Sequence, residues 1–194
     1  MREQGDTRSR IQQVALELFT EHGYEATSLR EIAERLGVTK AALYYHFKTK
    51  EDIVASFMED RAAALQEIVT WAQGQPRTVE TRREVLRRYA ALMTSSRHHQ
   101  VMRFLERNQT ALRSHPKSER MREIMYTVMD LLSSPGDPLP VRVKCSVALF
   151  AMHATWFIDQ DGGYTDDERT DAALAVALEL VESAAAEAER SVTR

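Results

Sequence analysis

The segment that most limits what this chain can fold into runs from Thr27 to Lys50, and its pattern predicts two short helices joined by a tight turn. Ser28 and Thr39 can cap the two helices, and Glu31 completes a capping box with Ser28. Gly37 predicts the end of the first helix, because glycine tolerates the left-handed conformation that stops helices. One face of that helix is apolar, through Leu29, Ile32, Ala33 and Leu36. The pattern is that of a helix-turn-helix, whose second helix enters the DNA major groove.

Side chains suited to DNA concentrate on the second helix and its flanks. Four basic residues and no acidic residue lie between Arg35 and Lys50, and phosphate contacts need cations and hydroxyl donors. Ala41 is small enough for the backbone to approach base edges. The predicted DNA-binding residues are Ser28, Arg30, Thr39, Lys40, Ala41, Tyr44, Tyr45, His46, Lys48 and Lys50. The alternative is a solvated basic hairpin, but capping, turn and side-chain signals agree on DNA binding.

With the motif G-V-T-K-A-A-L-Y-Y-H-F-K-T-K at residues 37–50, the chain resembles the TetR family of bacterial transcriptional regulators. The resemblance implies a three-helix DNA-binding domain at residues 1–50 and a helical effector-binding and dimerisation domain at residues 51–194. A disordered tail is expected at residues 1–6. The first helix is then expected from Asp6 or Thr7 to about His22, with one apolar stripe that packs behind the motif.

The rest of the chain also carries helical spacing and no strand-like alternation. Helices are expected at about residues 50–73, 79–95, 98–113, 118–132, 141–160 and 166–189. Gly74 and Pro76 interrupt the pattern, and the run S-S-P-G-D-P-L-P predicts a loop. The predicted fold class is therefore all-α with about nine helices. The resemblance divides them into an N-terminal three-helix helix-turn-helix domain and a C-terminal helical domain for ligand binding and dimerisation.

Charge and composition limit which binding partners and which cell compartment are expected for the protein. The formal net charge is −3, but residues 1–50 carry 8 Lys and Arg against 7 Asp and Glu, which suits site-specific binding of double-stranded DNA. Cys145 is the single cysteine and has apolar neighbours, so an inert buried thiol in a reducing cytoplasm is favoured over a redox sensor. The polar N-terminus is no secretory signal. Because the most apolar run, Val147–Ile158, is too short for a bilayer span, no membrane partner is expected.

The resemblance assigns two roles to the C-terminal domain. TetR-like proteins dimerise through their last two helices, which here are rich in alanine; burial of those faces within one chain is the alternative. The resemblance also implies a pocket for a small, largely apolar effector, bordered by the Met-rich middle of the chain. The predicted pocket residues are Met93, Met102, Phe104, Met125, Tyr126, Met129, His153 and Trp156.

The expected function is a ligand-responsive repressor that binds a palindromic operator as a homodimer and is released by its effector. One alternative is a TetR-like DNA-binding protein controlled by a protein partner without a small ligand. Another is a helical enzyme with an unmarked site. The sequence contains no glycine-rich phosphate loop, nucleophile elbow or metal-ligand spacing, and therefore predicts no enzyme, no cofactor and no metal site.

Overall fold

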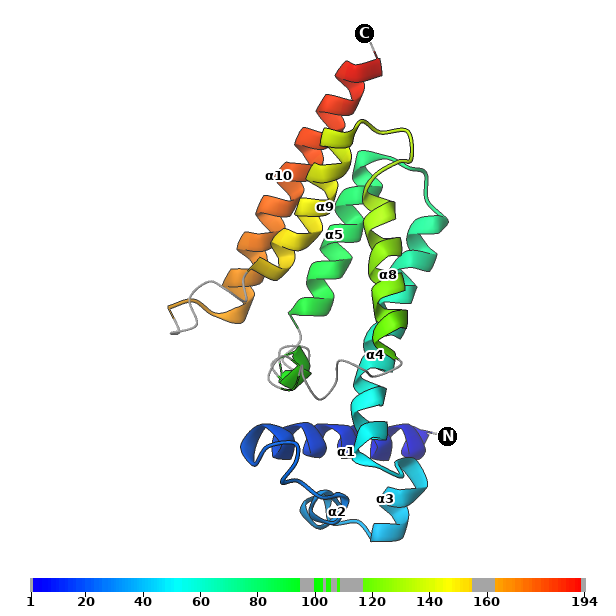
Figure 1. The fold of residues 1–194 in the computed structure, drawn as a ribbon, viewed down its shortest axis with the longest axis vertical. Coiled ribbons are helices and arrows are strands. Elements are labelled where there is room, and N and C mark those ends of the chain that lie inside the picture. Colours follow the sequence, from blue (N-terminus) through cyan, green and yellow to red (C-terminus); the bar gives the residue numbers. More distant parts are fainter. Residues whose placement is uncertain are drawn as a thin grey trace. The chain divides into compact units, whose positions relative to one another are not determined.

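A computed structural model of the chain describes residues 2–94, 100–102, 104–105, 108, 117–154 and 163–192. It contains no strand within these residues, so the predicted all-α class is confirmed. The helices with defined bounds are α1 (Arg2–Glu21), α2 (Leu29–Leu36), α3 (Lys40–His46), α4 (Lys50–Gln73), α5 (Val79–Met93), α8 (Lys117–Leu132), α9 (Leu139–Ala154) and α10 (Asp166–Val192) (Figure 1).

Two helices start earlier than the sequence pattern indicates. α1 begins at Arg2, where a disordered tail was expected, because a polar extension of a helix carries no apolar periodicity by which to detect it. α9 begins at Leu139, followed by Pro140. Proline is tolerated in a first helical turn, since the N–H that it lacks would have no partner there. The helix expected at residues 98–113 lies mostly outside the described residues, as does Trp156.

The chain divides into two compact units. The first comprises Met1–Ala62 with Ser96–Arg120, and the second comprises Ala63–Ser95 with Met121–Arg194. The division falls within α4, whose first half belongs to the first unit. The boundary between a DNA-binding domain and an effector-binding domain, expected after residue 50 from the family resemblance, stays a prediction.

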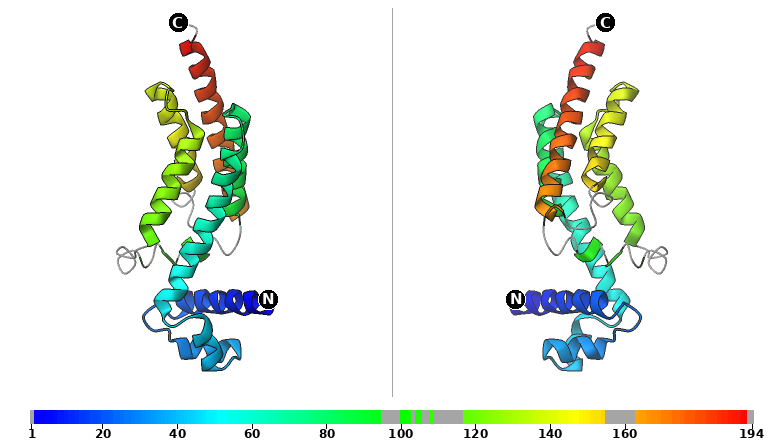
Figure 2. Two further views of the ribbon diagram at one scale, coloured as in Figure 1. Left: turned by 90° about the vertical axis from the view of Figure 1, so that its right-hand side faces the viewer. Right: turned by 90° about the vertical axis from the view of Figure 1, so that its left-hand side faces the viewer.

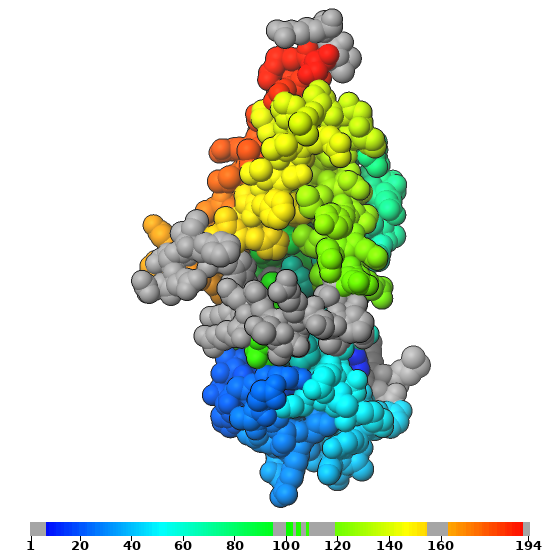
Figure 3. All heavy atoms as spheres, viewed as in Figure 1, coloured from blue at the N-terminus to red at the C-terminus, as the bar shows by residue number. Residues whose placement is uncertain are grey.

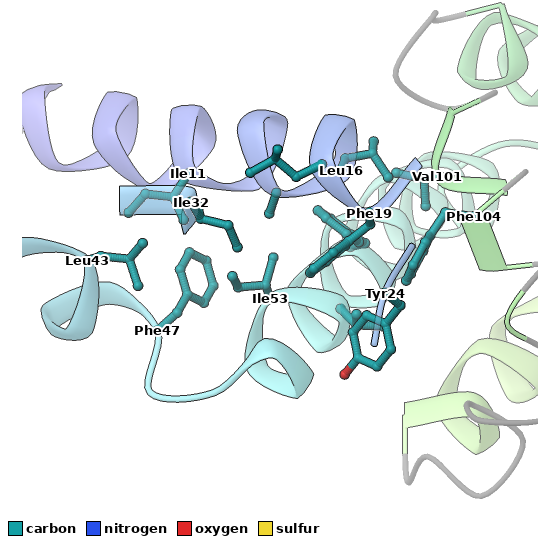
Figure 4. Packing of buried hydrophobic residues seen from close by; sticks show 14 of the residues in the cluster. Ile11, Leu16, Phe19, Tyr24, Ile32, Leu43, Phe47, Ile53, Val101 and Phe104 are labelled. Carbon is teal, nitrogen blue, oxygen red and sulfur yellow. The ribbon is translucent and has the colours of Figure 1, made fainter. Parts of the chain in front are cut away.

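The first unit is built on one apolar core to which each of its helices contributes (Figure 4). Ile11 of α1, Ile32 of α2, Leu43 of α3 and Ile53 of α4 are all fully buried. Phe47, directly after α3, is 2% exposed and closes the same core. Burial of these side chains supplies the main stabilisation of such short helices. It also fixes which sides of α2 and α3 face outward.

In the second unit, α10 packs along α9 and α5 (Figure 2). Ala173, Ala177 and Ala184 of α10 are buried, and their small side chains allow close packing of helices. The partly buried ion pair of Arg82 with Asp137, 3.2 Å long, joins α5 to the loop after α8. Among the residues that the structure describes, no helix combines the length and apolarity needed to cross a bilayer.

Cys145 of α9 is fully buried, as predicted from its apolar neighbours. Burial raises the pKa of its thiol, because the thiolate would lose its hydration. A thiol in this environment is a poor nucleophile and a poor redox sensor.

Candidate DNA-binding site

α2 begins and ends at the residues that the sequence indicates. Ser28 has an extended backbone, and its hydroxyl accepts a hydrogen bond from the Glu31 N–H at 3.2 Å. Gly37 has φ +73°, in the left-handed region, and the N–H of Val38 donates to the Ala33 carbonyl at 3.1 Å. This is the glycine-terminated helix stop, so both the predicted cap and the predicted stop are confirmed.

The predicted capping box is only half formed. The Glu31 carboxylate lies 2.7 Å from Nδ1 of His22, the residue after α1. It thus joins α2 to the end of α1, while the hydroxyl of Ser28 makes the cap alone. Arg35 of α2 reaches Glu21 of α1 at 3.4 Å and makes a second link between the same helices. The Glu31 side chain therefore contacts α1, whereas its spacing from Ser28 had predicted a capping-box contact within α2.

α3 starts at the predicted cap and is held by one inward side. The Ala42 N–H donates to the Thr39 hydroxyl at 3.1 Å, which caps the helix. Leu43 is the fully buried residue of α3. On the other sides Lys40 and Ala41 are exposed and Tyr45 is 68% exposed. A short helix with cationic, small and aromatic side chains facing solvent can enter a groove of duplex DNA.

The polar side chains of α3 lie close together. Nζ of Lys40 is 5.4 Å from the centre of the Tyr44 ring, within range of a cation–π interaction. Tyr45 and His46 make an edge-to-face contact at 5.2 Å. Lys48 is exposed, and its ammonium donates to the Tyr44 carbonyl at the end of the helix. Ammonium groups and ring N–H and O–H donors thus extend along α3 from its first residue to just beyond its end.

Besides Lys48, two other predicted DNA-binding cations are engaged within the protein. Arg30 of α2 pairs with Glu34 at 2.7 Å, although both side chains remain exposed. Lys50 is partly buried, and its ammonium donates to the backbone carbonyls of Tyr24 at 2.6 Å and Glu25 at 3.2 Å. Its partners within the protein are thus carbonyls of the α1–α2 turn, and the phosphate contact expected for it stays a prediction.

Reciprocal hydrogen bonds fix the junction between α3 and α4. The Asp52 carboxylate accepts from the N–H groups of Lys48 at 3.0 Å and Thr49 at 2.9 Å. The Asp52 N–H in turn donates to the Thr49 hydroxyl at 3.0 Å. This arrangement satisfies amides that the helix start leaves without helical partners, and it sets where α3 ends relative to α4.

A buried polar group holds α1 against α4 behind the motif. The amide of Gln12, 2% exposed, donates to the Ser56 hydroxyl at 2.7 Å and to the Asp60 carboxylate at 2.9 Å. The Ser56 hydroxyl donates onward to the Ile53 carbonyl at 2.6 Å. Buried polar groups without partners are costly, so these side chains specify one register between the two helices.

Sequence reasoning predicted Tyr24 as a core residue at the turn, which its burial confirms, but it missed the role of Thr27 and the polar partner of Tyr24. Thr27 is 1% exposed, and its hydroxyl lies 3.2 Å from the Leu18 carbonyl and 2.8 Å from the Gly23 carbonyl. Tyr24 donates its hydroxyl to Glu51 at 3.0 Å. Burial and the Glu51 carboxylate raise the pKa of Tyr24. Hydrogen bonds, first from its own backbone amide, lower the pKa of Glu51. The α1–α2 turn is therefore pinned from several sides.

The predicted pocket residues fall in different places. Phe104 is 3% exposed and stacks on Phe19 at 5.3 Å in the core of the first unit (Figure 4), whereas Met93, Met125 and Met129 belong to the second unit. Met102 also belongs to the first unit. Tyr126 of α8 is 60% exposed. Their helical spacing gave no information on which unit each side chain would join.

The remaining pocket residues that the structure describes belong to the second unit. Met93 is buried at the end of α5, and Met125 and Met129 of α8 are partly buried. Nε2 of His153 lies 2.7 Å from the Tyr89 hydroxyl, which is 3.9 Å from Sδ of Met125. Tyr89 was not among the predicted pocket residues because its spacing indicated core. A buried tyrosine nevertheless needs a hydrogen-bonding partner, and that need was the available signal.

α9 and α10 carry an exposed apolar surface. It is formed by Leu139, Val143, Val147 and Phe150 of α9, with Val176 of α10. In the space-filling view, α9 (yellow) and α10 (orange to red) form adjoining surfaces (Figure 3). The alanines divide between two roles: Ala148 and Ala177 are buried within the chain, whereas Ala172 and Ala175 are exposed. We use the term α9–α10 face for the five exposed large apolar residues, Leu139, Val143, Val147, Phe150 and Val176.

The first unit has the architecture of a helix-turn-helix DNA-binding domain, and the comparisons with known proteins agree. Residues 11–57 match the family model described as bacterial regulatory proteins, tetR family. The regulator AcrR of Shigella flexneri is 48% identical over 54 residues, which are 28% of this chain and 25% of AcrR. The repressor KstR2 of Rhodococcus jostii is 34% identical over 77 residues, 38% of each chain. These matches span less than two fifths of the relatives' lengths.

Solved structures extend the likeness over most of the chain. A TetR/AcrR-family regulator from Thermobifida fusca is 29% identical with a TM-score of 0.59, covering 89% of this chain and 97% of that one. AibR, solved with isovaleryl coenzyme A and operator DNA, shares the fold at 24% identity and a TM-score of 0.60, covering 87% and 96%. Residues 11–57 thus carry the DNA-binding domain of the TetR family of bacterial regulatory proteins, and the chain as a whole is similar to solved TetR-family regulators. In the described part of the chain, no group of three or more acidic, His or Cys residues is placed to hold a metal ion.

Proposed function

We propose that the protein is a ligand-responsive transcriptional repressor that binds a palindromic operator as a homodimer and leaves it when a small, largely apolar effector binds. The observation that carries the proposal is the outward side of α3. There Lys40, Ala41 and Tyr45 are exposed on a helix that Leu43 anchors in the core. A helix placed in this way reads base edges with its outward side chains.

The proposed DNA contacts divide by chemistry. Lys40 and Ala41 lie in the first turn of α3, where side chains reach base edges in helix-turn-helix proteins. Tyr44, Tyr45, His46 and Lys48 supply hydroxyl, ring N–H and ammonium donors for phosphates. Ser28, Arg30 and Thr39 flank them at the starts of α2 and α3, and Lys50 follows at the start of α4. Phosphate contacts position the domain, while the base contacts specify the sequence.

The α9–α10 face supports the homodimer. Phe150 is 61% exposed, and burial of so large an apolar side chain in an interface is favourable because it removes apolar surface from water. Isologous pairing of this face would bury each such residue twice, once in each protomer. A dimer also presents two copies of α3 about one helical turn of DNA apart or a multiple of it, which accounts for a palindromic site.

The effector proposal rests on the second unit. Tyr89, His153 and Met125 come from three helices and meet at one polar point among apolar side chains. Effector sites are mostly apolar, with a few convergent polar groups that set specificity. AibR is a relative in fold that was solved with an acyl coenzyme A. We propose that Met93, Met125, Met129, Tyr89 and His153 border the effector site of this protein.

A selection experiment tests the whole proposal. The purified protein is incubated with a pool of random-sequence duplexes, and the retained duplexes are sequenced. We expect a palindromic consensus whose half-sites lie about 10 base pairs apart, or a multiple of that spacing. Enrichment of no sequence would refute the regulator assignment. Binding of the selected duplex is then measured against a panel of acyl coenzyme A esters and free fatty acids. Relief of binding by none of them would favour control by a protein partner.

A further inference from the structure

A lysine of α9 joins this helix to α10, which runs along α9 in the opposite direction (Figure 1). The ammonium of Lys144 donates to the Ser183 hydroxyl at 2.9 Å and to the Glu187 carboxylate at 2.5 Å. Ser183 and Glu187 are one helical turn apart, so both side chains can face α9 from the same side of α10. The side chains of Lys144 and Glu187 are 31% and 28% exposed. We call Lys144, Ser183 and Glu187 the Lys144 clamp.

The buried side of α10 does little to fix its position by shape alone. Ala173, Ala177 and Ala184 are buried there. An alanine projects only one methyl group, so it interlocks less deeply with a neighbouring helix than a leucine or a phenylalanine does. Polar contacts between defined partners can specify the register of helices in such cases. The Lys144 clamp supplies contacts of this kind between α9 and α10.

An arginine of α5 holds α10 next to the Lys144 clamp. The guanidinium of Arg83 pairs with the Glu182 carboxylate at 2.9 Å and with the Glu80 carboxylate of its own helix at 2.9 Å. Glu182 directly precedes Ser183 in α10. Cations from two neighbouring helices thus contact consecutive residues of α10. Together these contacts fix both the position of α10 along its axis and its rotation about that axis.

The register between α9 and α10 decides which side chains form the α9–α10 face. Val143 and Val147 of α9 lie beside the Lys144 clamp, and Val176 supplies the α10 part of the face. Neighbouring residues of a helix point in different directions, because there are about 3.6 residues per turn. A slip of α10 by one residue would therefore put Ala175 or Ala177 in the place of Val176. Such a slip would reduce the apolar surface that the face offers to a second protomer.

We propose that Lys144 is a positioning residue for dimerisation: its ammonium fixes the register of α9 against α10 and so brings the exposed apolar side chains of both helices into one face. This inference rests on the proposed homodimer. Both acceptors of the ammonium belong to the same chain as Lys144. The clamp is therefore formed before two protomers meet, and it acts on the dimer through the shape of the face.

The test is an exchange of charges within the Lys144 clamp. Lys144→Glu and Glu187→Lys each place two like charges side by side, whereas the double variant restores one ion pair. We expect each single variant to raise the dimer dissociation constant about tenfold in sedimentation velocity, because loss of the pair and repulsion act together. The double variant should return to within about threefold of the parent. Arg122→Glu on α8 is the matched control, since Arg122 is exposed outside the face and undergoes the same change of charge; it should leave the dissociation constant unchanged.

Amide hydrogen exchange separates the clamp from an ion pair formed between protomers. It is measured in the Phe150→Ala background, at a protein concentration below the dissociation constant of that variant. In the monomer, Lys144→Glu should speed exchange in the peptide spanning residues 178–190 about fivefold, and addition of Glu187→Lys should reverse the change. Unchanged exchange in this peptide, or a double variant that dimerises no better than the single variants, would overturn the positioning role. A parent that sediments as a monomer at every concentration would refute the homodimer instead, and exchange in residues 178–190 would still decide whether Lys144 holds α10.

Discussion

Phe150 provides the strongest test of the proposed dimer. It is 61% exposed on α9, at helical spacing from Val143 and Val147, which are 51% and 45% exposed. Phe150→Ala removes the aromatic ring from the α9–α10 face without adding charge. The substitution should leave the fold of the chain intact, because most of the ring contacts no other part of the same chain. Ala177 is a less suitable site, since it is fully buried within the chain and its replacement would disturb the core.

The magnitude follows from the exposed area. A phenylalanine has about 200 Å² of surface to bury, so a residue 61% exposed can bury about 120 Å² more in an interface. At about 25 cal/mol per Å² this corresponds to about 3 kcal/mol for each protomer. Two-fold symmetry doubles the effect to about 6 kcal/mol, of which alanine retains part. We therefore expect a loss of about 4 kcal/mol, which is about a thousandfold in the dimer dissociation constant.

Sedimentation velocity over a range of protein concentrations measures this shift. Tyr126→Ala on α8 is the matched control, because Tyr126 is 60% exposed and lies outside the α9–α10 face. It should leave the dissociation constant unchanged. A Phe150→Ala variant that remains as dimeric as the parent would place the interface elsewhere. Equal dissociation of both variants would show a general effect of losing exposed rings and would refute the reasoning.

Three further predictions concern the first unit. Lys40→Ala should change the preferred base at one position of each half-site, at a cost of about 1–3 kcal/mol for the parent site; selection of identical sites by variant and parent would contradict its base contact. Gly37→Ala should lower the free energy of unfolding in urea by about 1–2 kcal/mol, because φ is +73° although space around its Cα is open. Gly136→Ala, equally open but without positive φ, should be near neutral; equal losses would exclude backbone strain as the cause. The raised pKa of Tyr24 means that folding favours its protonated form, so its contribution to stability is complete below about pH 10 and declines above it. Tyr24→Phe should therefore lose less stability than the parent between about pH 8 and pH 11 in urea unfolding, and equal losses would contradict this assignment.

Local signals in the sequence predicted the helix-turn-helix well. Caps at Ser28 and Thr39 and the stop at Gly37 depend on the residue itself and on partners within a few positions. Those interactions form in the same way whatever the rest of the chain does. The burial of the Cys145 thiol was predictable for a related reason, since Val141, Ala148 and Leu149 lie at helical spacing from it on the buried side of α9.

Long-range partners explain what the sequence did not reveal. Glu31 had the correct spacing for a capping box, but His22 lies across from it on the end of α1. Phe104 follows α5 in the chain and yet packs in the core of the first unit. Helical spacing indicates that a side chain faces inward, but it does not indicate which core receives it. The predicted pocket therefore mixed residues of two units.

The basic residues near α3 also show that long-range partners limit what the sequence alone can predict about DNA contacts. Charge alone predicted phosphate contacts for Arg30, Lys48 and Lys50, but the structure gives each a different partner. Arg30 pairs with a carboxylate that it can leave at little cost, because both side chains are exposed. Lys48 donates to one backbone carbonyl, that of Tyr44, in an exposed contact. Lys50 donates to two backbone carbonyls, and its contact with Tyr24 is partly buried. The cost of turning each cation toward DNA thus depends on what it would leave unpaired, and that cost is smallest for Arg30 and largest for Lys50.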